Sequence, residues 1–181
     1  MEFTDVVKLR RSVRKFRTQE VENEKIEQIL ECARLAPSWA NKQCWSFVIV
    51  KDKEKIKLLS KAAGVVNIWL KKAPIIIVAC GDPRLSGIRN GIEYFIVDVA
   101  IAMEHLILAA ADLGLGSCWI GAFDEGRIKE VLEIPNNIRV VAITPFGYPA
   151  KKVGMQENIT RVILRSQKRK PLSEIVHYDK W

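Results

Sequence analysis

Three arginines and a serine stand within five residues near the start of the chain: Arg10, Arg11, Ser12 and Arg14. A guanidinium group is planar and can bind two phosphate oxygens at once, which the ammonium group of lysine cannot do. The cluster therefore indicates a phosphate site, with one further charge available for the rest of the ligand. A solvent-exposed basic turn has the same composition, so the cluster alone leaves both interpretations open.

Side chains for other kinds of chemistry are scarce. The two histidines, His105 and His177, have no partner at the spacing of a metal site. The glycines at positions 116 and 121 have the spacing of a P-loop, but Ala122 and Phe123 stand where lysine and Ser/Thr are required. The chain also lacks a nucleophile elbow and a dinucleotide-binding glycine motif. A bound cofactor that carries the reaction fits this sequence better than a catalytic set of side chains.

Length and composition are typical of one globular domain. The chain has 181 residues, of which 49% are hydrophobic and 28% are charged. Its N-terminus lacks the basic start and apolar segment of a secretory signal, which predicts a cytoplasmic location. Four cysteines without a C-x-x-C pair are expected to be small buried hydrophobic residues. The longest apolar region, residues 92–113, carries several ionisable side chains, which predicts a buried helix and no membrane partner.

The basic character of the chain raises the question of nucleic acid. The formal net charge is +8, and basic residues concentrate at positions 10–17 and 161–170. No helix-turn-helix, zinc-finger or RNA-binding motif accompanies them, and no aromatic stacking platform is evident. Because a basic surface also attracts phosphorylated cofactors and anionic substrates, we predict no nucleic-acid partner.

Hydrophobic periodicity and turn residues predict alternating helices and strands. Thr4 is expected to cap the first helix, and Pro37 is expected to end the second. The helix predicted over residues 92–113 is apolar nearly all round and must be covered by the core or by a partner subunit. The predicted helices cover residues 4–9, 23 to Pro37, 52–63, 92–113 and 124–132, and the predicted strands cover residues 46–50, 75–80 and 138–146.

Three segments and the C-terminus together resemble the FMN-dependent nitroreductase family, in particular its short NAD(P)H-dependent members. The segments are residues 10–16 (RRSVRKF), 36–47 (APSWANKQCWSF) and 114–123 (GLGSCWIGAF), followed by the ending 170–181 (KPLSEIVHYDKW). They occur in the order typical of the family and span nearly the whole chain. The set is far more specific than any one segment alone.

The resemblance implies that FMN carries the chemistry and that no side chain or metal is catalytic. By this resemblance, the FMN phosphate would be bound by Arg10, Arg11, Ser12 and Arg169. The N1–C2=O edge of the flavin would be met by Arg14, the pyrimidine edge by Asn67, and the ring by Ile120 and Gly121. The residues that would approach from the other subunit are Pro37, Ser38, Trp39 and Asn41.

The resemblance also implies a fold and a reaction. The fold is α+β, with a mixed, largely antiparallel sheet flanked by helices, in an intertwined homodimer. Residues 1–149 form the FMN-binding domain, and residues 150–181 are expected to form an arm of the same domain that packs on the partner subunit. A hydride would pass from NADH or NADPH through flavin N5 to a nitroaromatic, quinone or similar small acceptor, by a ping-pong mechanism.

Other functions stay open at this point. Relatives with the same fold use FMN for reductive dehalogenation or for breakdown of the flavin itself, and fold alone does not exclude these reactions. From another class, the chain would be a basic nucleic-acid-binding module.

The chain departs from the family pattern at two residues. Cys44 stands where proline is usual, and Gly121 stands where larger members have glutamate. The chain also lacks long insertions, so the pocket is expected to be open or covered by residues 83–90.

Overall fold

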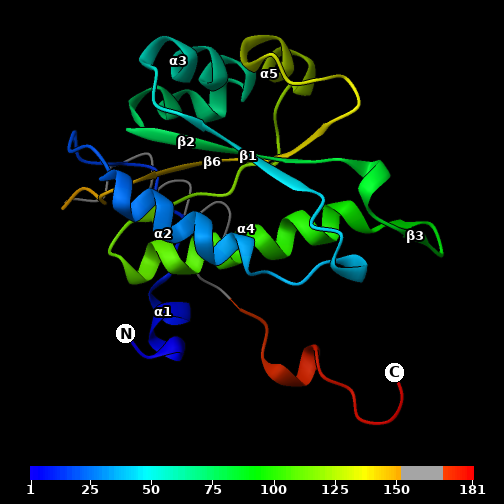
Figure 1. The fold of residues 1–181 in the computed structure, drawn as a ribbon. Helices are drawn as coiled ribbons and strands as arrows, with labels where there is room; N and C mark the ends of the chain where they lie inside the picture. Colours follow the sequence, from blue (N-terminus) through cyan, green and yellow to red (C-terminus); the bar gives the residue numbers. More distant parts are fainter. Residues whose placement is uncertain (152–168) are drawn as a thin grey trace. The chain divides into compact units, whose positions relative to one another are not determined.

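The structure, a computed structural model, describes residues 1–151 and 169–181. The chain divides into two compact units, Met1–Ala150 and Lys151–Trp181. The first unit contains the β-sheet, and helices lie on both faces of the sheet (Figure 1).

The main sheet has four strands: β1 (Trp45–Val50), β2 (Ile75–Gly81), β5 (Gly116–Ser117) and β6 (Arg139–Gly147). They lie in the order β1-β2-β6-β5, and each strand is antiparallel to its neighbour. All seven residues of β2 are buried, as expected for a strand of isoleucine and valine with a neighbour on each side. The predicted α+β fold with a largely antiparallel sheet is confirmed. The sequence did not predict β5, because two residues between glycines give no periodic signal.

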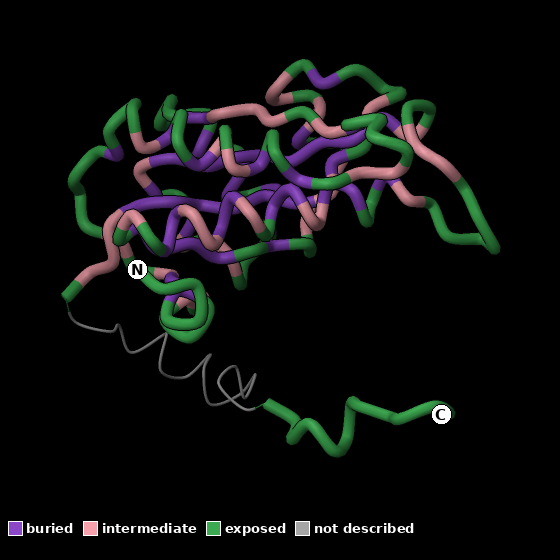
Figure 2. Tube along the Cα trace, turned by 60° about the horizontal axis from the view of Figure 1, so that its bottom comes forward, coloured by how far each residue is buried: buried purple, intermediate pink, exposed green. Residues whose placement is uncertain are grey.

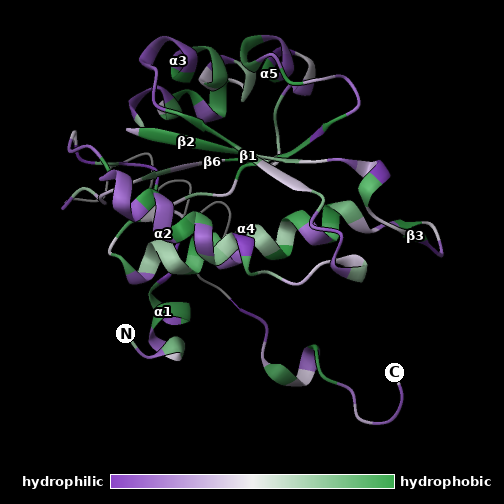
Figure 3. Ribbon diagram, in the orientation of Figure 1, coloured by the Kyte–Doolittle hydropathy of each residue, from purple (hydrophilic) through white to green (hydrophobic). Residues whose placement is uncertain are grey.

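Helices cover the two faces of this sheet in pairs. Figure 1 shows α3 (Lys53–Ala62) and α5 (Glu125–Leu132) on one face, and α2 (Asn23–Arg34) and α4 (Tyr94–Asp112) on the other. Each face has its own hydrophobic core, one around Met103 and Leu106 of α4 and one around Leu59 and Ile128. Figure 3 shows hydrophobic residues in β2 and along much of α4. Two cores therefore hold the sheet from both sides.

Helix α4 is the longest element of the first unit. It has the length and apolar composition that a membrane-spanning helix needs, yet half of its apolar window is buried inside the protein. Its fully buried residues include Val99, Met103 and Leu106, and its one buried acidic residue is Asp98. Burial of this kind agrees with the predicted core helix.

The predicted helix over residues 92–113 begins two residues late. Ile92–Glu93 form strand β4, which pairs with β3 (Ile88–Arg89) in a short antiparallel hairpin. Asn90 and Gly91 make its turn, with φ values of 52° and 78°. An Asn-Gly pair favours the left-handed backbone that a two-residue hairpin needs. The region expected to be a polar loop therefore holds a 3₁₀ helix, η3 (Pro83–Leu85), and this hairpin.

The helix ends follow local sequence in two cases and differ in a third. The carboxylate of Asp52 accepts from the Lys55 N–H at the start of α3, and that of Asp124 accepts from the Arg127 N–H at the start of α5. By contrast, α1 (Phe3–Leu9) begins before Thr4, and its N-cap residue, Glu2, makes no side-chain capping bond. The prediction that Thr4 caps this helix is wrong. Two further 3₁₀ helices, η1 (Trp39–Asn41) and η2 (Val65–Lys72), lie in segments for which the sequence predicted neither a helix nor a strand.

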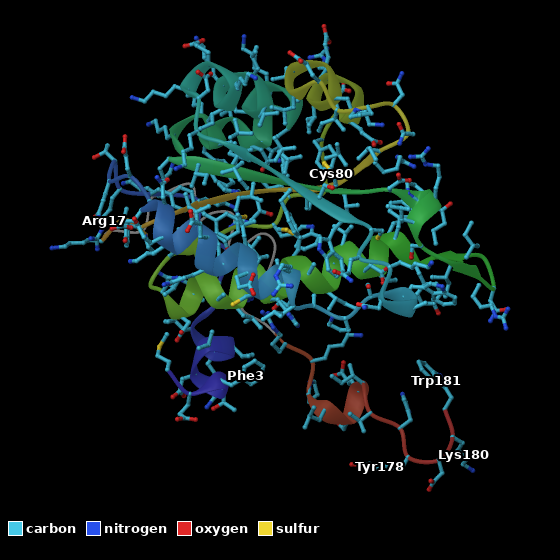
Figure 4. The ribbon with its side chains drawn as sticks, in the orientation of Figure 1. Phe3, Arg17, Cys80, Tyr178, Lys180 and Trp181 are labelled. Carbon is cyan, nitrogen blue, oxygen red and sulfur yellow. The ribbon has the colours of Figure 1, made fainter. Side chains whose placement is uncertain are left out.

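Within the second unit, the described residues 169–181 contain one 3₁₀ helix, η4 (Leu172–Glu174). The larger hydrophobic side chains of residues 169–181, including Leu172, Tyr178 and Trp181, are exposed (Figures 2 and 4). The rings of His177 and Trp181 stack with their centroids 4.6 Å apart. The expectation that this arm packs on a partner subunit stays a prediction.

Candidate functional site

The basic segment, residues 10–17, lies along the edge of the sheet. Ser12 forms a parallel bridge with Ser117 of β5, and the Val13 N–H donates to the Ser117 carbonyl over 2.8 Å. Further along, Phe16 pairs with Pro149 just beyond β6. The arginine cluster is therefore attached to the sheet through its backbone and is not a free turn.

Gly116 permits this close approach. A Cβ atom at position 116 would lie 2.7 Å from Cγ2 of Val13, which is shorter than real carbon–carbon contacts. The absence of a side chain at Gly116 thus brings the basic segment against β5.

A cavity of about 500 Å³ opens beside the arginines. Three of its lining residues are cations, Lys8, Arg10 and Arg11, and none of the described lining residues is acidic. The remaining lining residues are apolar, glycine or serine: Leu9, Val13, Ala111, Gly114, Leu115, Gly116, Ser117 and Pro149. A concave surface with cations on one side favours an anionic ligand such as a phosphate.

Arg14 carries the clearest sign of a missing ligand. Its Nη1 atom is buried and has no hydrogen-bond partner among the described residues. A buried guanidinium nitrogen is costly without an acceptor, so such a group needs an explanation. Arg17, three residues later, differs: its side chain is exposed and its Nε donates to the Pro149 carbonyl (Figure 4). The orphaned donor of Arg14 fits an acceptor supplied by a bound molecule.

Ile120, Gly121 and Asn67 extend the site along β6. Ile120 exchanges two backbone hydrogen bonds with Ile143 of β6, of 3.1 and 3.0 Å. Gly121 is exposed, and the nearest atom to an added Cβ there, Nε1 of Trp119, lies 3.9 Å away. The surface above Gly121 is therefore open.

Asn67 is linked to this segment through the end of α3. The N–H of Asp124, shortly after Gly121, donates to the Ala62 carbonyl over 2.9 Å. The Nδ2 of Asn67, on η2, donates to the Ala63 carbonyl over 3.0 Å. These two hydrogen bonds thus join η2 and the segment after Gly121 to the same end of α3.

The second part of the predicted site is the loop of residues 38–43. Ala40, Asn41 and Gln43 have positive φ values of 44°, 56° and 49°. Non-glycine residues rarely adopt this conformation, and it persists only where the surroundings enforce it. Side chains do so here: the Gln43 N–H donates to Oγ of Ser38 over 2.9 Å, and Nε2 of Gln43 donates to Asn41.

Trp39 fixes the same loop to its surroundings. Its backbone N–H donates to Oδ1 of Asp98 over 2.9 Å, and its ring lies 4.5 Å from the ring of Tyr94. A Cβ on Gly87 would lie 2.3 Å from Cε2 of Trp39, so the indole lies directly on Gly87. Pro37 and Asn41 remain exposed. The loop therefore presents polar and apolar groups outward from a fixed base.

The two parts of the site lie at opposite ends of α4. The loop with η1 lies beside the N-terminal end of this helix, and α1 with the basic segment lies beside its C-terminal end (Figure 1). Asp98, which holds Trp39, and Ala111, which lines the cavity, are about 20 Å apart along the helix at 1.5 Å per residue. One chain therefore does not bring all predicted residues together. Arg169 belongs to the second unit, so its role stays a prediction.

The buried cysteines are chemically quiet. Burial, followed by the charge of Asp98, raises the pKa of the Cys44 thiol to about 12, and burial raises the pKa of Cys80 to about 11. The thiolate is the reactive form, so neither residue is a nucleophile near neutral pH. Cys44, Cys80 and Cys118 are buried as predicted, whereas Cys32 is half-buried.

Sequence reasoning missed three residues that shape the site: Ser86, Gly87 and Asp98. Asp98 was noted only as an ionisable residue in an apolar helix. An acidic residue on the inner face of such a helix requires hydrogen-bond donors, and this was the available signal.

Comparison with known proteins identifies relatives along the whole first unit. The model of the Nitroreductase family matches residues 7–67 and 61–148. A protein of Archaeoglobus fulgidus, provisionally named NADH dehydrogenase/NAD(P)H nitroreductase, is 40% identical over 144 residues, which are 77% of this chain and 81% of that protein. An FMN reductase [NAD(P)H] of Bacillus subtilis is 29% identical over 174 residues, covering 87% and 70% of the two chains.

Solved structures and a more distant relative agree with this match. The crystal structure of a nitroreductase family protein from Clostridium difficile 630 superposes with a TM-score of 0.84 at 34% identity and covers 100% of both chains. The human iodotyrosine deiodinase 1 is 27% identical over 204 aligned positions, covering 97% of this chain and 68% of that protein. The family match, the shared fold and the order of the site segments lead to one conclusion: the chain belongs to the nitroreductase family.

Proposed function

We propose that this protein is an FMN-dependent oxidoreductase that uses NADH or NADPH to reduce a small electron-poor acceptor. The observation that carries the proposal is the buried Nη1 of Arg14, which has no partner among the described residues and directly follows, in the chain, the segment that lines a cation-rich cavity. The family relatives named FMN reductase and NAD(P)H nitroreductase support the cofactor and the electron donor.

The residues at the cavity have distinct roles. Arg10, Arg11 and Ser12 hold the FMN phosphate, where guanidinium forks match its oxygens. Arg14 lies close behind them in the chain, and its Nη1, which lacks a partner among the described residues, would donate to the N1–C2=O edge of the flavin. A fixed cation at that edge favours the anionic reduced form, so Arg14 raises the tendency of the flavin to accept a hydride. The family resemblance adds Arg169 to this proposed set of phosphate ligands.

Two chains are needed to complete each site. The loop of residues 38–43 is held about 20 Å along α4 from the cavity of its own chain, too far to share one flavin with it. We therefore assign Pro37, Ser38, Trp39 and Asn41 to the partner's flavin in a homodimer. Because FMN and dimer formation stabilise the same assembled state, FMN should favour the dimer.

Bound FMN would supply hydride-transfer chemistry between NADH or NADPH and a nitroaromatic or quinone. Gly121 leaves the adjoining surface open, and we assign its backbone N–H to flavin N5. Asn67 supplies its amide to the pyrimidine edge. Donor and acceptor use the same open surface in turn, which gives ping-pong kinetics.

The experiment is an absorption titration of the purified protein. Apoprotein incubated with FMN and freed of excess ligand should retain an oxidised-flavin spectrum. Anaerobic NADH or NADPH should then bleach it, and a nitroaromatic or quinone should restore it. Parallel lines in double-reciprocal plots of initial rate against NADH or NADPH concentration, at several acceptor concentrations, would support the ping-pong order. Protein that retains no FMN would contradict the proposal.

Reductive dehalogenation is the second candidate, because iodotyrosine deiodinases are among the relatives. In that case the reduced protein would be reoxidised by a halogenated phenol with release of halide. Halide release, measured with an ion-selective electrode, that is faster than the reduction of a nitroaromatic by the same protein would favour the dehalogenase.

A further inference from the structure

Asp98 is a buried carboxylate that the proposed chemistry does not use. It lies in the second turn of α4, and only 2% of its surface is exposed. Burying a carboxylate is costly unless hydrogen-bond donors surround it. The position of Asp98 therefore implies that it stabilises something specific around it.

Three donors from two separate segments meet this carboxylate. The Trp39 N–H donates to Oδ1 over 2.9 Å, and the Ser86 hydroxyl donates to Oδ2 over 2.8 Å. The Cys44 thiol lies 3.6 Å from Oδ2 and makes a weaker contact. Trp39 lies in the loop of residues 38–43, Cys44 directly follows this loop, and Ser86 precedes the β3–β4 hairpin. One side chain thus joins the loop and the base of the hairpin to α4.

Packing between the two segments reinforces this junction. The Trp39 ring lies on Gly87 and against Tyr94, and the Tyr94 N–H donates to the Gly87 carbonyl over 2.9 Å at the base of the hairpin. Between Trp39 and Cys44 the backbone has three non-glycine residues with positive φ. A strained loop of this kind keeps its shape only where its ends are fixed.

We propose that Asp98 is a positioning residue for the FMN site of the partner subunit: its carboxylate holds the loop of residues 38–43, together with the β3–β4 hairpin, in the conformation that completes that site. The role of Asp98 rests on the proposed function, because the loop matters only if it meets a flavin. Asp98 itself touches neither FMN nor substrate.

The first test is Asp98→Asn with Asp112→Asn as its matched control. Asparagine keeps the shape and an acceptor for Trp39, but its NH₂ group faces Ser86 and Cys44, which donate in the native protein. Asp112 lies on the same helix, is partly exposed and pairs with the N-terminal ammonium. We expect Asp98→Asn to weaken FMN binding about tenfold, the loss that one to two hydrogen bonds imply, and Asp112→Asn to leave it unchanged.

The readouts are flavin-fluorescence titration of the apoproteins, apoprotein melting temperature, and the near-ultraviolet circular dichroism of the Trp39–Tyr94 pair. A purely structural role would lower the melting temperature of apoprotein without changing FMN affinity or the aromatic signal. If Asp98→Asn does not fold, Ser86→Ala replaces it, because this variant removes only the donation from the hairpin side. We expect Ser86→Ala to raise the FMN dissociation constant about threefold.

The second test asks in which subunit Asp98 acts. Co-expression of an Asp98→Asn chain with an Arg14→Ala chain yields mixed dimers. If the loop serves the partner, one site carries both changes and the other carries neither, so half of the sites bind FMN with wild-type affinity. If Asp98 acts on its own chain, both sites are impaired and no high-affinity fraction returns.

The outcomes separate the two proposals. Wild-type protein that binds FMN, with Asp98→Asn and Ser86→Ala binding it equally well, would overturn the role of Asp98 and leave the proposed function intact. Mixed dimers without a high-affinity fraction would also overturn that role. Wild-type protein that takes up no FMN would overturn both.

Discussion

The basic segment and the loop of residues 38–43 are both predicted to bind the flavin, yet they are held in different ways. The basic segment follows the edge of the sheet, with backbone bonds to Ser117 and a close contact with Gly116. The loop has no strand to follow and depends on side chains, above all on Asp98. The first segment contributes charge and the second contributes shape.

This difference explains why one segment is readable from sequence and the other only in part. A sheet edge positions neighbouring residues in a regular way, so the ligand of the arginine cluster can be predicted from local sequence alone. The loop takes its conformation from a carboxylate some sixty residues later in the chain. Variants at each segment should therefore fail differently, and the following experiments test that expectation in order of expected effect.

The largest effect is expected at Arg14. Arg14→Ala removes the guanidinium whose buried Nη1 lacks a partner among the described residues, so FMN would lose a charged hydrogen bond. We expect about 100-fold weaker FMN binding, measured by fluorescence titration, with little change in apoprotein stability. Arg17→Ala is the control, since Arg17 is exposed and bonds to the Pro149 carbonyl. Equal affinities of the two variants would show that charge at Arg14 is not what the ligand needs.

Gly116→Ala tests the attachment of the basic segment to the sheet. The new Cβ would collide with Val13, which should cost roughly 1–3 kcal/mol of unfolding free energy and displace the arginines. The free energy of unfolding of the apoprotein in urea and the affinity for FMN should therefore decrease together. Gly126→Ala is the control: its Cβ meets Oδ1 of Asp124 at an ordinary 3.5 Å, and alanine favours the helix. A stable Gly116→Ala protein would mean that the segment is not held as described.

Ala40→Gly tests the strain in the loop. Glycine adopts the φ of 44° at this position without a steric penalty, so apoprotein should gain up to about 1 kcal/mol of stability. Ala122→Gly, at an exposed residue without positive φ, should instead lose about 0.5 kcal/mol. Thermal unfolding compares them. Loss of stability in Ala40→Gly would indicate that the loop is not strained.

The smallest effect is expected at Cys44. Because burial raises the pKa of Cys44 to about 12 and that of Cys80 to about 11, both thiols stay protonated at pH 8. A thiol reagent should therefore label half-buried Cys32 in native protein and spare these two, as mapped by mass spectrometry. Urea-unfolded protein, in which every cysteine reacts, is the control. Rapid labelling of Cys44 at pH 8 would show that the base of the loop opens.

Sequence patterns predicted most of the framework, for physical reasons. The apolar run at residues 75–80 could be only a buried strand, and Asp52 and Asp124 cap their helices through bonds to residues close in sequence. The prediction for Thr4 failed because the helix already begins at Phe3, with Glu2 in the N-cap position. The two-residue strands β3, β4 and β5 escaped because each depends on its partner and has too few residues for a periodic signal.

The site was predicted to the extent that it resembles a known pattern. The motif at residues 10–14 lies against β5, and the motif at residues 120–121 pairs with β6 through Ile120. Asp98 and Ser86 carry no motif, because their role arises from tertiary contacts. The departure at Cys44 has a structural sense: the thiol fills a buried position beside Asp98 and adds a weak contact.

Helix α4 also acts as a ruler. Its N-terminal part holds the loop through Asp98, and its C-terminal part lines the cavity at Ala111. Each residue of an α-helix advances the axis by 1.5 Å and turns it by about 100°. A single insertion between these two positions would rotate the loop at one end of the helix relative to the cavity at the other, and would misplace the loop in the proposed homodimer. We therefore expect the protein to tolerate an insertion in the β3–β4 hairpin but not in the middle of α4.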